Sequence, residues 1–208
     1  MTRNEIIEKV KVDMDEYTPE NVSVPYEDLI SPAMDESARD ILLASPLHLL
    51  VASTIPLSGG TPVVSRIAYS NDKAFITVPS DFLRLYEIRF PLWKRAVRKA
   101  LTPEDDQYKI QENEYIKSGY GRPTVTVVRT SINGGSVDKY FECAKVLSGA
   151  VPSVATYVKT DLPENLPDIF KDAISWLTAS KLFKILEYAE NSKACMEQFA
   201  NSMALIVK

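Results

Sequence analysis

Cysteine and histidine are scarce in this chain of 208 residues, and their scarcity excludes several kinds of site. There are two cysteines, Cys143 and Cys195, and a single histidine, His48. The cysteines lie far apart, and neither has another cysteine or histidine at the spacing of metal ligands. This excludes zinc fingers, zinc ribbons and CxxC redox motifs. We expect both thiols to be free and packed as small apolar groups, as in a reducing compartment.

The single histidine also limits nucleophilic catalysis. His48 lies in a leucine-rich segment, residues 46–51, whereas a nucleophile–histidine pair needs a polar and accessible cleft. We therefore expect His48 to be packed in the interior. Because any histidine-based triad would have to use this residue, the sequence argues against a hydrolase of that type.

Phosphate-binding loops and long apolar runs are missing as well. The chain has 7 glycines, and neither a Walker A sequence nor GxGxxG occurs. The nearest glycine-containing stretch, residues 119–123, ends in a proline and predicts a turn. No apolar run reaches the roughly 18–20 residues of a membrane span, and the first eight residues lack the core of a signal peptide. We expect a soluble protein, made in the cytosol, with no membrane partner.

The residues that are present have the composition of an ordinary globular protein. Hydrophobic residues make up 45% and charged residues 25% of the chain, and 24 basic against 28 acidic residues give a net charge of −4. A chain of this length can bury a core without a disulfide or metal. Tight binding of nucleic acid by the whole surface is not expected, although a local basic patch remains possible.

The charges are unevenly distributed along the chain. Residues 1–40 hold 11 acidic and 4 basic side chains, and residues 84–99 hold six basic side chains against one glutamate. Three interpretations stay open: head-to-tail contact between copies, nonspecific attraction to passing DNA, and a solvated surface. No recognition-helix motif is present. The six basic candidates for a DNA channel or a subunit interface are Arg84, Arg89, Lys94, Arg95, Arg98 and Lys99.

An acidic run, Glu104-Asp105-Asp106, is a candidate for a divalent-metal site. The run follows Thr102-Pro103, which has the pattern of a helix N-cap followed by proline at the first helical position. Carboxylates in the first turn of a helix are favourable against the helix dipole. Capping is therefore the preferred interpretation, and a metal-dependent hydrolase or nuclease is the alternative.

The N-terminal part of the chain shows helical patterns. Thr2 and Glu5 have capping-box spacing and precede apolar residues at helical spacing, which predicts a helix ending near residue 18. Ser31-Pro32 predicts the start of a second helix, with Met34, Ala38, Ile41 and Leu42 on its inner face.

The C-terminal part is also helical by its pattern. Residues 168–188 predict the longest helix, with apolar residues over more than the stripe that a surface helix needs. Such a helix is either central to the core or shared with a neighbouring subunit. A last helix is predicted after Asn191-Ser192.

The middle of the chain changes to a period of two, which is typical of strands. Strands are predicted at residues 63–69, 74–78, 86–90, 92–97, 124–129, 139–144 and 154–158, with turns at residues 71–72 and 133–135. Two helical pieces are predicted among them. One begins at Phe82, after the cap Pro79-Ser80-Asp81, and the other covers residues 102–116.

Helices, a β-rich middle and helices again predict an α+β fold. Neither helical end is expected to bury its apolar face alone, so the simplest solution packs the first two helices against the last two. The central strands then form an antiparallel insertion. The predicted division is residues 1–55 and 161–208 for the helical body, and residues 56–160 for the insertion.

Two parts of the sequence resemble the head–tail connector (adaptor) proteins of tailed bacteriophages. The first is VPSDFLRL at residues 78–85, followed by WKR at residues 93–95. The second covers residues 157–167, with DLP and LP motifs, and continues into the helix that contains Asp172-Ala173. Within that family the sequence is most similar to a ring protein of the short-tailed crAss-like phages.

The resemblance implies a structural virion protein rather than an enzyme, with no cofactor and no catalytic residue. Such proteins have a helical body and a β-rich insertion and form a ring beneath the portal, here implied to be a dodecamer. The implied partners are other copies of the chain, the portal protein, a downstream tail or second ring protein, and genomic DNA.

The implied ring also gives the basic stretch a role and the protein a location. Its DNA channel would be lined partly by Arg95, Arg98 and Lys99, and the ring would be assembled in the host cytoplasm and remain in the virion. A DNA-binding accessory protein is a further alternative.

Overall fold

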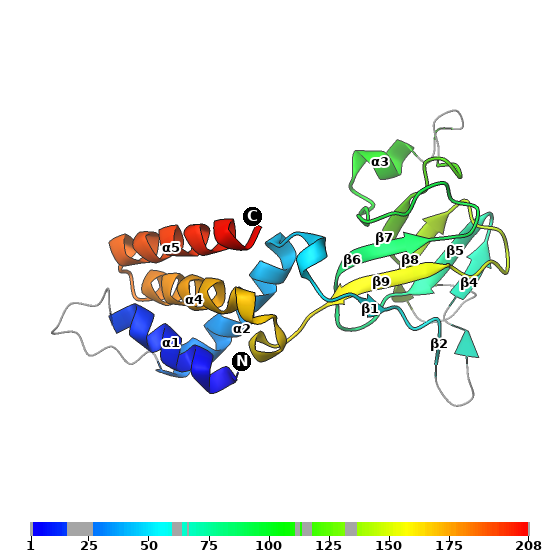
Figure 1. Cartoon of the computed structure of the whole chain (residues 1–208). Helices are drawn as coiled ribbons and strands as arrows, with labels where there is room; N and C mark the ends of the chain where they lie inside the picture. Colours follow the sequence, from blue (N-terminus) through cyan, green and yellow to red (C-terminus); the bar gives the residue numbers. More distant parts are fainter. Residues whose placement is uncertain are drawn as a thin grey trace. The chain divides into compact units, whose positions relative to one another are not determined.

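The computed structural model describes residues 2–15, 27–59, 64–65, 67–110, 113, 118–131 and 137–207. The chain forms two compact units (Figure 1). We call residues 1–50 and 160–208 the helical unit and residues 51–159 the β-rich unit. N- and C-terminal helices thus flank a central region of antiparallel strands, which confirms the predicted α+β class.

The helical unit is built around one central helix. Helix α4 (Lys171–Ile185) packs against α1 (Arg3–Asp15), α2 (Glu27–Ala44) and α5 (Ala189–Val207). Nine of the fifteen residues of α4 are buried. The broad apolar surface predicted for this segment is therefore covered within the chain, which makes α4 central to the core of its own unit.

The start of α1 follows the predicted capping box. The backbone N–H of Thr2 donates to Oε2 of Glu5 at 2.9 Å, and the backbone N–H of Glu5 donates to Oγ1 of Thr2 at 3.3 Å. Ile6, Val10 and Met14 are fully buried on one face of the helix. The predicted end near residue 18 lies outside the described residues.

Helix α2 begins earlier than predicted, at Glu27, so that Pro32 lies inside it. A serine–proline pair fits a helix start, whereas a proline inside a helix removes one backbone hydrogen bond and costs stability. Burial of Ile30, Ala33 and Met34 against the unit's core favours the longer helix. The predicted inner face of α2 is confirmed, since Met34, Ala38, Ile41 and Leu42 are buried.

Predictions for the last two helices were partly wrong. The segment predicted as one helix from residue 168 begins with a 3-10 turn, η4 (Asp168–Phe170), and α5 is the longer helix, with 19 residues. The chain breaks at Glu187, which has φ 66°, rather than at residues 191–192. The backbone N–H groups of Glu187 and Tyr188 donate to the carbonyls of Lys184 and Phe183, the pattern of a Schellman motif.

The β-rich unit contains two main antiparallel sheets. A four-stranded sheet has the order β4 (Ile67–Ser70), β5 (Lys73–Thr77), β8 (Val137–Ala144), β7 (Val125–Ser131). A three-stranded sheet has the order β1 (Ser53–Thr54), β9 (Val154–Lys159), β6 (Phe82–Arg89). A small pair, β2 (Ser58–Gly59) and β3 (Val64–Ser65), completes it. Both main sheets contribute to one core cluster, with Ile76 and Phe141 from the first and Leu85 and Ile88 from the second.

Several sequence predictions for this unit hold. The turn at residues 71–72 is present, with φ of 48° at Asn71 and 59° at Asp72, as in a two-residue hairpin. Neither cysteine is in a disulfide, and both are fully buried, Cys143 in the core cluster of this unit and Cys195 in the helical unit. The predicted turn at residues 133–135 lies outside the described residues.

Other predictions were wrong. The helical piece expected at Phe82 is part of strand β6, which pairs with β9, because a short apolar run fits either structure and pairing decides. Residues 92–97 form no strand, apart from a single bridge between Val97 and Ile88. In the stretch predicted as a helix at residues 102–116, the described helical part is α3 (Asp106–Lys109).

The prediction for His48 was also wrong. The histidine lies in a 3-10 turn, η1 (Leu47–Leu49), and its side chain is exposed. The turn directs Leu50 inward instead, where it is buried. A single histidine among leucines does not show which side chains of a short turn point to solvent.

Candidate functional site: a basic loop on the β-rich unit

The candidate site is the segment that follows β6, residues 91–99, which we call the basic loop. The indole Nε1–H of Trp93, a residue with 1% of its surface exposed, donates to the carbonyl of Lys145 at 3.0 Å. The Trp93 ring lies 5.1 Å from that of Phe90. The backbone N–H of Lys94 donates to the carbonyl of Tyr120 at 2.8 Å. The loop is therefore held on the unit by a buried aromatic anchor.

The far end of the loop is fixed as well. The backbone N–H and carbonyl of Val97 both bond to Ile88, each at 2.9 Å. Between the two anchors, Lys94 and Arg95 are exposed, and so is Leu92, with 51% of its surface accessible. The loop thus presents cations beside an apolar side chain from a fixed backbone.

The structure gathers four of the six basic candidates and separates the other two. Lys94, Arg95, Arg98 and Lys99 belong to the basic loop, whereas Arg84 and Arg89 lie on β6. Arg84 is half-buried, and burial lowers the pKa of its guanidinium from the ordinary value. Arg98 pairs with Glu87 of β6 at 3.2 Å.

Three of these cations line one surface pocket. Arg95, Arg98 and Lys99 line a pocket of about 330 Å³, to which apolar residues such as Val97 and Leu101 also contribute. Guanidinium and ammonium groups beside apolar side chains suit an anion that carries some apolar surface. Carboxylate and phosphate both have suitable charge.

The acidic run next to the basic loop is engaged locally. The Asp105 carboxylate accepts hydrogen bonds from the Thr102 backbone at 2.6 Å and from the Thr102 hydroxyl at 3.1 Å. The bond from the Thr102 backbone, more than any other cause, lowers the pKa of Asp105. Asp105, not Thr102 as predicted, stands at the N-cap of α3, and Asp106 pairs with Lys109 at 3.2 Å. Among the described residues, no three His, Cys, Asp or Glu side chains are grouped to hold a metal ion.

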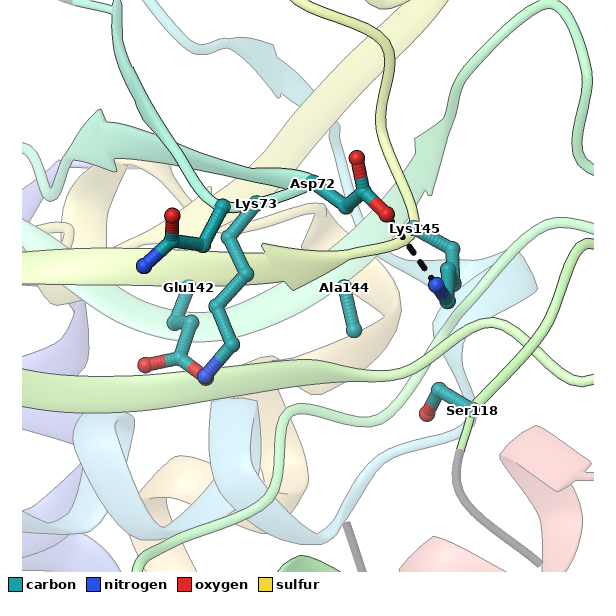
Figure 2. Close-up of a pocket in the computed structure, with 7 residues that line it drawn as sticks. Asp72, Lys73, Ser118, Glu142, Ala144 and Lys145 are labelled. Atoms are coloured by element: carbon teal, nitrogen blue, oxygen red, sulfur yellow. Dashed lines mark hydrogen bonds and ion pairs between the residues drawn. The ribbon is translucent and has the colours of Figure 1, made fainter. Parts of the chain in front are cut away.

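A second pocket, which the sequence did not indicate, lies beside the β4–β5 turn (Figure 2). It has a volume of about 270 Å³ and is lined by two ion pairs. Lys73 contacts Glu142 at 2.6 Å, and Lys145 contacts Asp72 at 3.1 Å. The partners are about 70 residues apart in sequence, so spacing carried no signal for this site.

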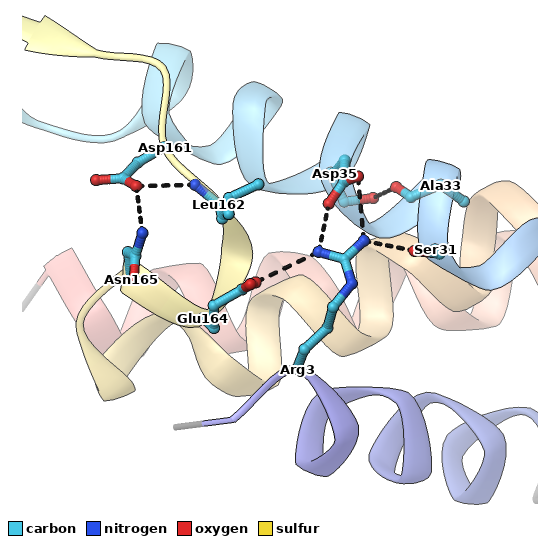
Figure 3. A network of polar contacts seen from close by, with 9 residues as sticks. Arg3, Ser31, Ala33, Asp35, Asp161, Leu162, Glu164 and Asn165 are labelled. Carbon is cyan, nitrogen blue, oxygen red and sulfur yellow. Dashed lines mark hydrogen bonds and ion pairs between the residues drawn. The ribbon is translucent and has the colours of Figure 1, made fainter.

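The helical unit has an acidic surface beside the segment that follows β9. Arg3 of α1 bonds to Asp35 of α2 at 2.9 Å and to Glu164 at 3.3 Å (Figure 3). Its hydrogen bond to Asp35 is the main reason that the pKa of Arg3 lies above its ordinary value. A pocket of about 460 Å³ lies nearby, lined by Asp35, Glu36, Arg39, Thr160, Asp161, Leu162 and Asn165.

The uneven charge seen along the sequence coincides with the division into units. The helical unit has 18 acidic and 9 basic residues, a formal charge of −9. The β-rich unit has 10 acidic and 15 basic residues, a formal charge of +5, and the two values sum to the −4 of the chain. The two compact units therefore carry net charges of opposite sign.

Comparisons with known proteins do not add a relative. No family model matches the chain, and no curated protein matches it at a significant level.

None of the helices in the described ranges combines the length and apolar character needed to cross a bilayer. The candidates for function therefore rest on architecture, on the basic loop and on charge.

Proposed function

We propose that this chain is a structural virion protein, a head-to-tail connector subunit that forms a ring beneath the portal of a tailed bacteriophage. In this role it extends the DNA channel and provides a platform for tail assembly. It would act without catalysis or a cofactor. Its partners would be other copies of itself, the portal, the next tail or ring protein and the DNA in the channel.

The observation that carries the proposal is the composite helical unit. Both ends of the chain combine into one helical body, and an antiparallel β-rich unit is inserted between them. This is the architecture that the sequence resemblance implies for connector proteins. The resemblance itself lies in β6, in the basic loop and in the segment from β9 to α4.

The distribution of charge supports a ring for a separate reason. A closed ring repeats one heterologous contact, in which two different surfaces of the subunit meet. A subunit with a −9 body and a +5 body has two such surfaces of opposite sign. The α4 surface does not contribute to this argument, because the chain covers it internally.

Mass measurement of assemblies with the portal tests the proposal. The chain and the portal protein from the same genome are purified separately, mixed and measured by native mass spectrometry, with each protein alone as a control. We expect a complex of one portal ring with twelve copies of this chain. A chain that stays monomeric and never joins the portal would refute the proposal.

Two inexpensive measurements address the alternatives. Titration calorimetry with Mg²⁺ or Mn²⁺ tests the metal-dependent enzyme, for which stoichiometric heat abolished by Asp105→Asn and Asp106→Asn is required. Binding of a DNA duplex at increasing salt tests the accessory protein, which needs affinity that falls steeply with salt and disappears when the six basic residues are neutralised. A connector subunit gives neither result.

A further inference from the structure

The basic loop has the properties of a docking element. Trp93 and Val97 fix its backbone on the β-rich unit, so that little conformational entropy is lost when the loop binds. It presents exposed Lys94 and Arg95 beside Leu92, of which 51% is accessible. An apolar side chain next to cations is typical of protein interfaces, in which apolar contact supplies affinity and charge supplies orientation.

The helical unit offers a surface of the complementary kind. The charged residues that line its pocket of about 460 Å³ are three carboxylates and one guanidinium, Asp35, Glu36, Asp161 and Arg39, and Leu162, of which 50% is exposed, lies beside them. Figure 3 shows Asp161 and Leu162 on the segment after β9 and Asp35 on α2. Asp35 pairs with Arg3 and Glu36 pairs with Lys181 at 3.3 Å, and each carboxylate keeps acceptor sites beyond these contacts. We call this surface the acidic pocket.

Charge complementarity favours a second copy of the chain as the occupant. The acidic pocket belongs to the unit of formal charge −9, and the basic loop belongs to the unit of formal charge +5. Two copies attract one another when the β-rich unit of one meets the helical unit of the other, and they repel when like units meet. Such a contact is heterologous and can repeat from copy to copy.

The surroundings of the loop favour a protein surface over the DNA backbone. Arg98 is already paired with Glu87, and Lys99 lies close enough to Asp105 to help lower the pKa of that carboxyl. A continuous phosphate backbone along the loop would meet these two carboxylates and the apolar Leu92. A protein surface with separate carboxylates can place them away from Glu87 and Asp105, and an exposed leucine on that surface can contact Leu92.

We propose that the basic loop of one copy docks into the acidic pocket of a neighbouring copy, with Arg95 facing Glu36 and Leu92 facing Leu162. Closure of these contacts into a ring rests on the proposed function. The docking itself is a property of two surfaces and is measured separately.

Cysteine cross-linking tests the contact on the intact chain. Both native cysteines are buried, so that Leu92→Cys in one preparation and Leu162→Cys in another supply the accessible thiols. We expect the mixture to form a disulfide-linked dimer at least about tenfold faster than a control mixture in which Val137→Cys replaces Leu92→Cys. Val137 is exposed and lies at the first position of β8. The other end of β8, Ala144, precedes Lys145, whose carbonyl accepts the hydrogen bond from Trp93 of the basic loop.

Charge reversal tests the pairing of Arg95 with Glu36. We expect Arg95→Glu or Glu36→Lys, introduced into both members of the cross-linking pair, to slow dimer formation about tenfold, and the combination of both reversals to restore it. Arg129→Glu, an exposed residue of β7, changes the net charge equally and is expected to leave the rate unchanged.

The possible outcomes separate this inference from the proposed function. Cross-linking no faster than the control, or equal slowing by Arg129→Glu, overturns the docking even if a ring forms on the portal. Specific cross-linking without any ring leaves the docking in place and refutes the connector function. If Arg95→Glu abolishes salt-sensitive binding of a DNA duplex while cross-linking is unchanged, the loop is a DNA-binding surface and the docking is wrong.

Discussion

At the scale of single residues, buried polar groups in both units find partners far away in the sequence. Asp13 of α1 accepts a hydrogen bond from Ser175 of α4 in the core of the helical unit. In the β-rich unit, the Tyr157 hydroxyl donates to Asp81 at 2.8 Å. A buried polar atom without a hydrogen-bond partner lowers the stability of the fold, so these contacts fix one element relative to another.

The Lys73–Glu142 pair provides a test at this scale. Glu142 is only 8% exposed, so Lys73→Met leaves a buried carboxylate without its cation (Figure 2). We expect a loss of about 2 kcal/mol in the free energy of unfolding, and recovery of about half of it in Lys73→Met/Glu142→Gln, because the uncompensated charge is gone. Urea unfolding followed by circular dichroism measures both values.

A matched control makes the result specific. Lys109 is exposed and pairs with Asp106 on the same short helix, so Lys109→Met is expected to change stability by less than about 0.5 kcal/mol. Equal effects of Lys73→Met and Lys109→Met would show that the pair at the pocket contributes nothing beyond an ordinary surface pair.

Tyr157 gives a pH-dependent prediction. Burial, followed by the hydrogen bond to Asp81, raises the pKa of Tyr157 to about 12. Because the pKa is raised in the folded state, the protonated hydroxyl stabilises the fold. Its contribution to the free energy of unfolding is complete below the ordinary pKa of about 10 and is lost as pH rises from there towards 12. We expect Tyr157→Phe to be about 1 kcal/mol less stable than wild type at neutral pH.

The measurement compares the two proteins over a pH series. The difference in stability is expected to shrink above pH 10, and the tyrosinate absorbance titration of Tyr157→Phe is expected to lack a late transition. A difference in stability that stays constant up to pH 12 would mean that the hydroxyl titrates normally.

At the scale of elements, local patterns identified most helices and strands but not all of their types or ends. The segment from Phe82 was expected to begin as a helix and is a strand, because pairing with β9 buries Leu85 and Ile88. The helix expected to start at Ser31 starts at Glu27, because Ile30 is buried. Tertiary burial decides in both places where the local sequence allows two structures.

Pro32 tests the second of these cases. The proline lies inside α2, is exposed and lacks the N–H that would bond to the carbonyl of Asp28. Pro32→Ala restores this hydrogen bond without loss of packing, and we expect it to stabilise the chain by about 1–2 kcal/mol after the greater entropy of the unfolded chain is subtracted. Urea unfolding measures the gain, and a destabilised variant would mean that α2 begins at Ser31 after all.

At the scale of the whole molecule, the chain is divided into an insertion and a composite unit. All members of the β-rich core cluster lie within residues 51–159. The helical unit, by contrast, needs both chain ends, since α4 packs against α1, α2 and α5. One unit is therefore continuous in sequence and the other is not.

This division predicts that residues 51–159 fold on their own. We expect the fragment to show a β-type circular dichroism spectrum, the emission of a buried Trp93 and a cooperative urea transition. A shorter fragment, residues 56–160, lacks β1 and Ile55, which is fully buried and donates its backbone N–H to Ala155 at 2.9 Å. We expect it to be about 2–4 kcal/mol less stable. Equal stability of the two fragments would contradict the role of β1, and an unfolded longer fragment would contradict the division.

The candidate site could be predicted only in part. The six basic residues were evident as a cluster in sequence, but only four of them share the basic loop, and three of those line one pocket. The acidic pocket was hidden because Asp35 and Asp161 are more than a hundred residues apart. A pocket formed by distant segments depends on long-range packing, which no local pattern encodes.

The α+β class, the capping box of α1, the hairpin at residues 71–72 and the buried cysteines all followed from local chemistry, because neighbours in sequence or strict periodicity determine them. Tertiary contacts alone decided that Phe82 begins a strand, that His48 is exposed, that Pro32 lies inside a helix and that α4 is covered by its own chain. Each of these depends on which surface a segment meets, and that surface comes from residues far away in the chain.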